Sequence, residues 1–135
     1  MIYGLTSTVL SLRKSTNTGF VHGSYSIGGF IGNVSAFQNN SSVISFEGCE
    51  SAGHVSGGNY LGGYVGIMHD NINIELNITN CISTGTVTGL HSTGGFIGYF
   101  DGNHNVSISM MSSTNQGSVS ASFYRAFQND WDDFS

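Results

Sequence analysis

Polar and apolar residues alternate in four short stretches of the chain. Each stretch places one polar side chain between two apolar ones: Leu10-Ser11-Leu12, Ile44-Ser45-Phe46, Leu76-Asn77-Ile78 and Ile108-Ser109-Met110. Alternation with a period of two predicts a strand with one buried face. The stretches begin 34, 32 and 32 residues apart. We therefore expect the same strand to occur once in each of four repeats.

A glycine motif follows each alternating stretch. It reads Gly-x-Val-x-Gly, four residues, then Gly-Gly-aromatic-Ile/Val-Gly; it begins at Gly19, Gly53 and Gly85, and a partial copy begins at Gly117. The valine predicts a second short strand, and the aromatic and branched pair predicts a third. Glycines mark corners that need a positive φ or a close approach of two backbones. The structural glycines are Gly19, Gly23, Gly28, Gly29, Gly32, Gly53, Gly57, Gly62, Gly63, Gly66, Gly85, Gly89, Gly94, Gly95 and Gly98.

One coil of three short strands cannot bury its apolar side chains alone. Coils stacked about 4.8 Å apart can bury them, because each strand pairs in parallel with its equivalent in the next coil. We therefore predict an all-β parallel β-solenoid (β-helix) of about four coils, near residues 9–42, 43–73, 74–105 and 106–121. A β-sandwich or barrel is the alternative, since evenly spaced strands also occur there. Strict repetition of the motif favours the solenoid.

The segments outside this pattern are the polar stretches and the tail. The stretches Asn33–Ser42, His69–Asn73 and Asp101–Asn105 are predicted to be loops on one side of the stack, which is often the binding side of a repeat protein. Four aromatic residues are candidates for contact with a partner near these loops, or alternatively for packing inside the fold: Tyr60, Tyr64, Tyr99 and Phe100. In the tail, 122–135, aromatic residues recur at helical spacing: Phe123, Phe127, Trp131 and Phe134. This spacing predicts a helix that caps the open end of the solenoid or binds a partner.

The composition limits the classes of partner and the cellular location that fit this chain. Only Arg13, Lys14 and Arg125 are basic, against eight acidic residues, so nucleic acid and anionic membranes are disfavoured as partners. A surface of Ser, Thr and Asn fits an extracellular or cell-surface protein. No stretch approaches the about 18 apolar residues that a membrane span needs, and residues 1–15 do not read as a secretory signal. We therefore expect either a piece of a longer chain or a protein not secreted by that route.

The triplicated motif resembles the GLUG motif. That motif recurs in bacterial surface adhesins, in the non-catalytic part of IgA-specific metallopeptidases, and in large surface proteins of some eukaryotic microbes. The resemblance spans about Val9 to Ala121. It implies a non-enzymatic adhesive or spacer module with an unknown protein or glycan partner. The zinc motif His-Glu-x-x-His of the metallopeptidases is absent from the sequence.

Cys49 and Cys81 each lie four residues before a repeat glycine, where the other repeats carry Ser15 and Ser113. In a solenoid the two cysteines would stack. Neighbouring strands place Cα atoms about 4.8 Å apart, a separation that a disulfide tolerates. The alternatives are a disulfide bond and a pair of stacked reduced thiols, and the serines favour the thiols.

The sequence contains two further kinds of candidate site. Candidate N-glycosylation sites of the form Asn-x-Ser/Thr are Asn33, Asn39, Asn40, Asn77 and Asn105. Asn77 is expected on the outer face of a strand and the others in or beside loops. We expect no cofactor and no resident metal, although His69, Asp70 and His104 would approach one another across a coil. The alternative function is a polysaccharide-active β-helix enzyme, which requires paired carboxylates on one face.

Overall fold

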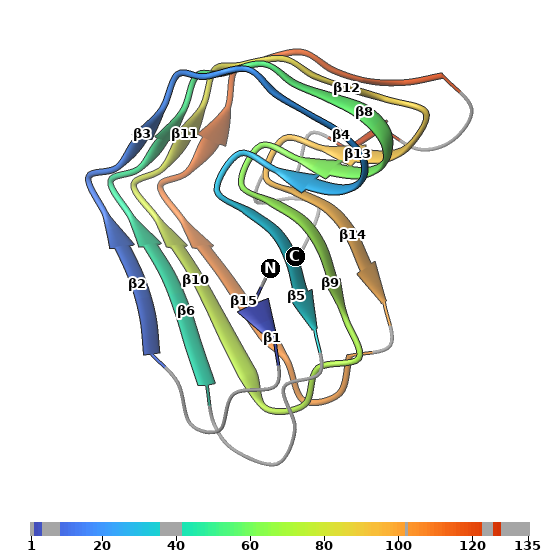
Figure 1. The fold of residues 1–135 in the computed structure, drawn as a ribbon. Helices are drawn as coiled ribbons and strands as arrows, with labels where there is room; N and C mark the ends of the chain where they lie inside the picture. The colour runs from blue at the N-terminus through green and yellow to red at the C-terminus, as the bar shows by residue number, and fades with distance from the viewer. Residues whose placement is uncertain (1, 4–8, 36–41, 102, 123–125, 128–135) are drawn as a thin grey trace.

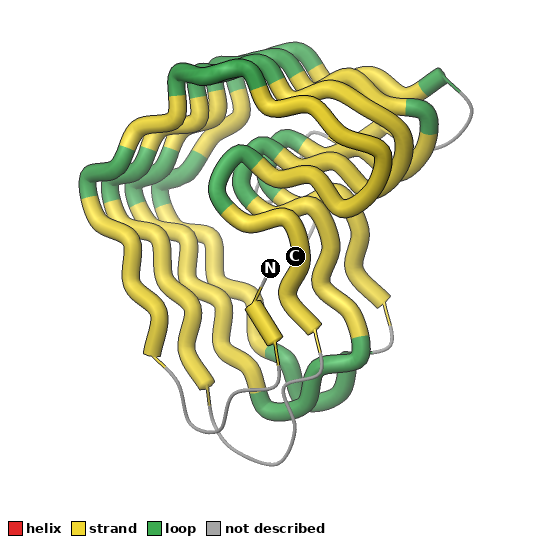
Figure 2. The backbone as a smooth tube through the Cα atoms, viewed as in Figure 1, coloured by secondary structure: helices red, strands yellow, loops and turns green. Residues whose placement is uncertain are grey.

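The computed structural model describes residues 2–3, 9–35, 42–101, 103–122 and 126–127. The chain forms a parallel β-solenoid of about three turns, and every strand pairs in parallel with a strand of the neighbouring coil (Figure 1). This confirms the predicted fold class. None of the described residues is helical. Figure 2 shows the strands of successive coils lying one behind another, with the corners aligned.

Four rows of strands make up the stack. The first row is β2 (Val9–Arg13), β6 (Ser42–Glu47), β10 (Ile74–Thr79) and β15 (Ser107–Met111). The second consists of two-residue strands: β3 (Thr16–Asn17), β7 (Glu50–Ser51), β11 (Ile82–Ser83) and β16 (Thr114–Asn115). The third is β4 (Val21–Gly28), β8 (Val55–Gly62), β12 (Val87–Gly89), β13 (His91–Gly94), β17 (Val119–Ala121) and β18 (Ala126–Phe127). The fourth is β1 (Ile2–Tyr3), β5 (Ile31–Ser35), β9 (Val65–His69) and β14 (Ile97–Asp101).

The register of the strands is the register of the sequence repeats. Ile44 pairs with Leu10 on one side and with Leu76 on the other, and Leu76 pairs with Ile108. The spacing between the first and second repeats exceeds the later spacings by two residues. Ser35 pairs with His69 at an offset of 34, whereas Ser42 pairs with Ile74 at an offset of 32. The two additional residues of the first coil therefore fall between Ser35 and Ser42.

The coil has one strand more than the sequence predicts, and its third strand is longer. The additional strand is the two-residue β3 and its equivalents, which show no shared apolar pattern. β4 and β8 are each eight residues long and run through the motif into its first paired glycine. In Figure 1 the chain bends sharply within this row and turns back toward β5 and β9, forming a lobe beside the main body.

Two apolar clusters fill the solenoid. The larger lies between the first and fourth rows and contains Phe46, Tyr64 and Phe96, all fully buried. The smaller fills the lobe with Ile27, Val55, Leu61 and Val87. Burial of these side chains by the next coil is the main force that holds one coil to another.

Close backbone approach, rather than left-handed backbone, explains most of the motif glycines. A Cβ built on Gly85 would lie 1.8 Å from the carbonyl oxygen of Gly53, its equivalent in the preceding coil. Gly19 has no such neighbour, and a Cβ there would meet only a side-chain atom of Asn17 at 3.6 Å. Of the motif glycines described, Gly57 combines both needs, with φ +153° and a Cβ that would lie 2.0 Å from the Gly23 carbonyl oxygen.

The predicted capping helix is wrong where the structure describes the tail. Ala126 and Phe127 form β18, which pairs with Thr93 and Gly94 of β13. The edge of β13 offers unpaired backbone groups, and a strand satisfies them where a helix would not. Phe123, Trp131 and Phe134 lie outside the described residues. A helix of the length and apolarity that crossing a bilayer requires does not occur in the described part of the chain.

Candidate functional site

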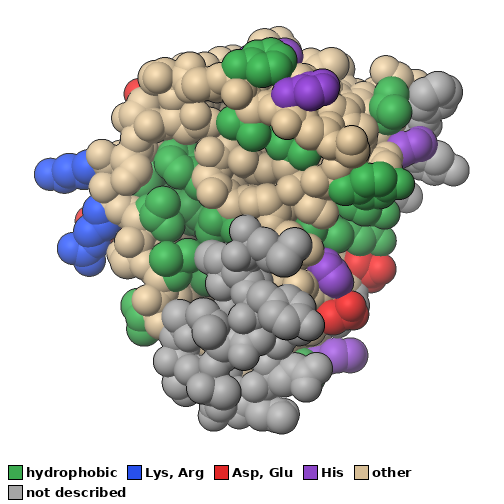
Figure 3. All heavy atoms as spheres, viewed as in Figure 1, with side chains coloured by type: hydrophobic (Ala, Val, Ile, Leu, Met, Phe, Trp, Pro, Cys, Tyr) green, Lys and Arg blue, Asp and Glu red, His purple; other side chains and the backbone are tan. Residues whose placement is uncertain are grey.

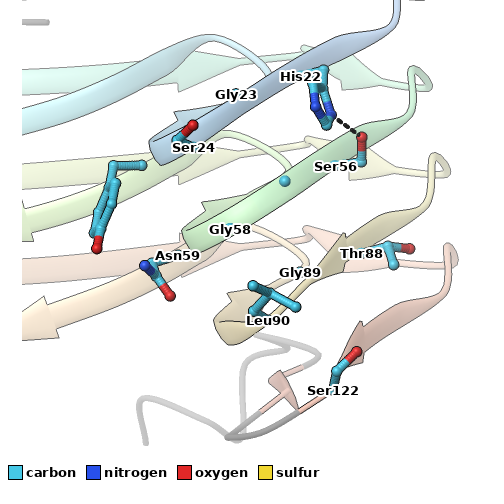
Figure 4. A pocket seen from close by; sticks show the side chains of 12 residues that line it. His22, Gly23, Ser24, Ser56, Gly58, Asn59, Thr88, Gly89, Leu90 and Ser122 are labelled. Carbon is cyan, nitrogen blue, oxygen red and sulfur yellow. Dashed lines mark hydrogen bonds between the residues drawn. The ribbon is translucent and has the colours of Figure 1, made fainter.

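A groove of about 580 Å³ crosses the coils at the bend of the lobe (Figure 4). Equivalent positions before and within the bend line it in successive coils: residues 22–25 in the first coil, 56–59 in the second, 88–90 in the third and Ser122 in the fourth. Because equivalent positions stack, the groove runs along the solenoid axis. From the first coil to the fourth it spans about 14 Å at the usual spacing of strands.

The side chains that line the groove are neutral or histidine. One wall carries His22, Ser56 and Thr88, and the Nδ1 of His22 lies 2.8 Å from the Oγ of Ser56. The floor and far wall carry glycines together with Asn59 and Leu90. None of the described lining residues is an Asp, Glu, Lys or Arg. The view in Figure 3 shows Lys and Arg side chains at one edge of the molecule, away from the lobe.

A chain of tyrosine rings extends from the groove. Tyr25 lines it and is 68% exposed. The Tyr25 and Tyr60 ring centroids are 6.4 Å apart, and those of Tyr60 and Tyr99 are 4.7 Å apart. The Tyr99 hydroxyl lies 3.0 Å from Asp101 Oδ2, and this bond raises the pKa of the phenol. The rings form a partly exposed aromatic surface beside the groove, which we call the tyrosine row.

The backbone of Tyr60 is left-handed, with φ +59°. Its equivalents in the neighbouring coils, Ser26 and Ser92, are left-handed as well, with φ +52° and +45°. The bend therefore requires this conformation in each of the three coils in which the structure describes this position. A large aromatic residue is unfavourable there, at a cost of about 1–2 kcal/mol. The ring of Tyr60 contacts the ring of Tyr99, and this contact offsets part of the backbone cost.

The first predicted loop, Asn33–Ser42, is longer than the structure allows, because Asn33 to Ser35 belong to β5 and Ser42 begins β6. The other two begin one residue later than predicted, since His69 ends β9 and Asp101 ends β14. Residues 36–41 lie outside the described part. A smaller depression of about 240 Å³ lies beside the loops, between Asn73, Glu75 and Asn105. Of these two depressions of the described residues, the larger lies at the bend of the lobe.

The four contact aromatics fall into two environments. Tyr64 is fully buried, packed between Phe30 and Phe96, so it is a packing residue, which is one of the two roles expected from the sequence. Its hydroxyl lies 2.7 Å from the carbonyl oxygen of Cys49. Tyr60 and Tyr99 belong to the tyrosine row, and Phe100 is 41% exposed on β14.

The sequons occupy unequal sites. Asn105 is exposed in the loop before β15, with its Nδ2 2.6 Å from Asn73 Oδ1. Asn77 is half-buried on the outward face of β10 and donates to Glu75 Oε1. Asn33 is not in a loop: it lies within β5, and its Oδ1 is buried without a partner in the structure. Asn39 and Asn40 lie outside the described residues.

Cys49 and Cys81 stack as predicted and are buried free thiols. The backbone N–H of Cys49 donates to Cys81 Sγ at 3.4 Å, and that of Cys81 donates to Ser113 Oγ at 3.1 Å. Burial raises the pKa of the Cys81 thiol. Both side chains therefore serve as small hydrogen-bonding groups at a corner of the solenoid.

The histidines and acids on the loop side form no metal centre among the described residues. His69 Nδ1 lies 2.9 Å from Asp70 Oδ2, and Asp101 pairs with His69 across one coil. His104 lies in an isolated bridge with Ile72, beyond the end of β14. The groups are exposed on one side of the stack but do not converge on one point.

Sequence reasoning missed the groove residues, although a signal for them exists. The glycines around the motif repeat in the first three coils, whereas the three residues that follow the second glycine change: Ser24–Ser26, Gly58–Tyr60 and Leu90–Ser92. In a stack that requires identical residues at equivalent positions, a variable segment is one that packing does not dictate, and such segments often bind ligands. Comparison with family models, curated proteins and solved structures finds no match to this chain.

Proposed function

We propose that this chain is a non-enzymatic adhesive repeat module of a cell-surface or secreted protein, and that the groove at the bend of the lobe holds its partner. The single observation that carries the proposal is the groove itself: about 580 Å³, formed by repeated positions and lined by side chains that packing does not require. The resemblance of the motif to GLUG repeats supports the same reading. The solenoid then serves as a rigid support that orients the groove.

The neutral surface supports an adhesive role over one that depends on charge. The chain has a net charge of −5, and the described basic residues, Arg13 and Lys14, lie at the corner that follows β2. Affinity in the groove would come from hydrogen bonds and from contact with Tyr25 and Leu90. Such contacts are individually weak, and surface proteins that bind through them commonly rely on several copies of a module.

The proposal is tested by immobilising the purified chain on beads and counting beads retained on cells from the source organism and from its surroundings. A Thr88→Asp variant places a carboxylate in the neutral groove. Thr88 is exposed in β12, so the fold should tolerate the change. We expect the wild-type beads to be retained and the Thr88→Asp beads to be released.

Ser11→Asp is the matched control, since Ser11 is an exposed strand residue on β2, outside the groove. It should leave retention unchanged. Equal retention by the two variants would place the adhesive surface elsewhere. If wild-type beads are retained no better than bare beads on any of the cells, the adhesive role is contradicted. The chain would then be a structural spacer, which is the other role that the motif implies.

The alternative, a polysaccharide-active enzyme, rests on one pair of acids. Asp70 directly follows β9, and Asp101 ends the equivalent strand β14 of the next coil; the Asp70 N–H donates to the Asp101 carbonyl oxygen at 3.3 Å. Paired carboxylates cleave glycosides when they flank the bond. An assay for new reducing ends with wild-type and Asp101→Asn protein distinguishes the two functions, because an adhesive module releases none.

A further inference from the structure

We propose that the groove binds a neutral, linear oligosaccharide that lies along the solenoid axis, with the tyrosine row as its stacking surface. This inference rests on the proposed adhesive function and names its ligand class. The shape of the groove, the chemistry of its walls, its paired backbone and its exposed aromatic ring all favour such a ligand.

The shape of the groove fits a chain rather than a compact ligand. Lining residues come from four successive coils, from His22 in the first to Ser122 in the fourth. Equivalent positions recur at intervals of about 4.8 Å, and one row, His22, Ser56 and Thr88, carries a hydrogen-bonding side chain in each of three coils. A polymer of similar units, laid along the axis, would meet each coil in turn.

The walls offer the groups that recognise hydroxyls. Serine and threonine hydroxyls, the imidazole of His22 and the amide of Asn59 all donate or accept hydrogen bonds. The Oδ1 of Asn59 is buried without a hydrogen-bond partner, although Asn59 lines the groove. A small rotation of this amide would let a ligand hydroxyl donate to that oxygen, which otherwise stays unsatisfied.

The charges and the backbone argue against two other ligands. An anionic polysaccharide would meet no cation in the described walls and would be repelled by a chain of net charge −5. An extended peptide that added a strand would need free backbone groups. The backbone at the bend is already paired between coils, since Leu90 N–H donates to the Gly58 carbonyl and Ser122 N–H to the Gly89 carbonyl.

Tyr25 supplies the apolar contact. Its ring is 68% exposed at the rim of the groove, and Tyr60 behind it holds the ring in place. The apolar C–H face of a sugar ring packs on an aromatic face, while the sugar hydroxyls keep their hydrogen bonds. This contact also explains why a tyrosine persists at position 60 despite its left-handed backbone, where the neighbouring coils carry serine.

The test is calorimetric titration of the chain with tetra- to hexasaccharides of neutral linear glucans, mannans, xylans and chitin, and with oligogalacturonate as the anionic comparison. We expect at least one neutral series to bind, and to bind more tightly as it lengthens from one sugar to four. Tyr25→Ala and Tyr60→Ser should each weaken that binding by about tenfold or more. Ser is already accommodated at the position equivalent to Tyr60, so the second variant keeps the fold.

Phe100→Ala is the matched control, because it removes an aromatic side chain that is 41% exposed but outside the groove. Its affinity for the neutral oligosaccharide should equal that of the wild type. The inference is overturned if no neutral oligosaccharide binds, if oligogalacturonate binds more tightly, or if binding is the same in Tyr25→Ala. In the bead assay, retention that survives periodate oxidation of the cell surface would indicate a protein partner, which overturns the glycan inference and leaves the adhesive function standing.

Discussion

The backbone N–H of Cys81 donates a hydrogen bond to the Oγ of Ser113, 3.1 Å away, and Ser113 occupies the same position one coil further along the stack. Cys49 N–H has the same relationship to Cys81 Sγ, at 3.4 Å. Cys81 Sγ and Ser113 Oγ also donate to the carbonyl oxygen two residues before them, of Thr79 and Met111, so each accepts from one coil and donates within its own. The corner selects a small side chain with a donor and an acceptor, which both Ser and Cys provide.

This relationship predicts the effect of two substitutions at Cys81. Cys81→Ser keeps an acceptor for the Cys49 N–H and a donor for the Thr79 carbonyl, so its free energy of unfolding should stay near that of the wild type. Cys81→Ala removes both groups and leaves a buried N–H without this acceptor. We expect it to be less stable than Cys81→Ser by about 1–3 kcal/mol in urea denaturation. Equal stability of the two variants would show that the corner selects only for size.

Thr93 interrupts an apolar row inside the lobe. It pairs with Leu61, which pairs with Ile27, and it is fully buried. Its Oγ1 has no hydrogen-bond partner in the structure. Thr93→Val keeps the shape and removes the unsatisfied hydroxyl, so it should raise the free energy of unfolding by about 1 kcal/mol.

The control for Thr93 is Thr88→Val, which makes the same chemical change at an exposed position of β12. It should alter stability by less than about 0.5 kcal/mol. A loss of stability in Thr93→Val would mean that the wild-type Thr93 hydroxyl binds a buried water. Thermal unfolding of Thr93→Val and Thr88→Val beside the wild type distinguishes these outcomes.

The rows that sequence reasoning found are those in which packing demands the same residue type in every coil. Leu10, Ile44, Leu76 and Ile108 share a buried row, and their alternation with polar residues was sufficient to place the first strand. The second row was missed, because a two-residue strand such as Thr16–Asn17 has no periodicity to detect.

The lobe was missed for a different physical reason. Its inward row runs Ile27, Leu61, Thr93, and the threonine conceals the pattern. Its bend depends on left-handed backbone at Tyr60 and its equivalents, which are serines rather than the glycines that usually signal such a conformation. The groove follows from this bend, so residues such as His22 and Asn59 could not be recognised as neighbours before the fold was known.

Another repeated corner is left-handed in every coil. Lys14, Gly48, Asn80 and Ser112 have φ values of +46°, +61°, +51° and +50°. Glycine and asparagine tolerate this conformation, whereas serine is less suited to it. Ser112→Gly should therefore stabilise the chain by about 0.5–1 kcal/mol in urea denaturation. Ser120→Gly, within β17, is the control and should destabilise it by about the same amount.

Tyr64 predicts how stability depends on alkaline pH. Its buried hydroxyl lies 2.7 Å from the Cys49 carbonyl oxygen and 2.9 Å from that of Ile82. Burial, together with the neighbouring Cys81, raises the pKa of this phenol well above its ordinary value of about 10. The neutral hydroxyl is thus favoured in the folded state. Its contribution is fully present below the ordinary pKa and is lost as the pH rises through that value toward the raised pKa.

We therefore expect the free energy of unfolding to fall as the pH rises above about 10, and to fall less steeply in Tyr64→Phe. At neutral pH the same variant should be less stable by about 1 kcal/mol, because it lacks the hydrogen bond to the corner. Tyr25→Phe is the matched control for an exposed hydroxyl and should follow the wild-type curve. Urea denaturation in a series of alkaline buffers measures the slopes, and parallel curves for wild type and Tyr64→Phe would refute the assignment of this dependence to Tyr64.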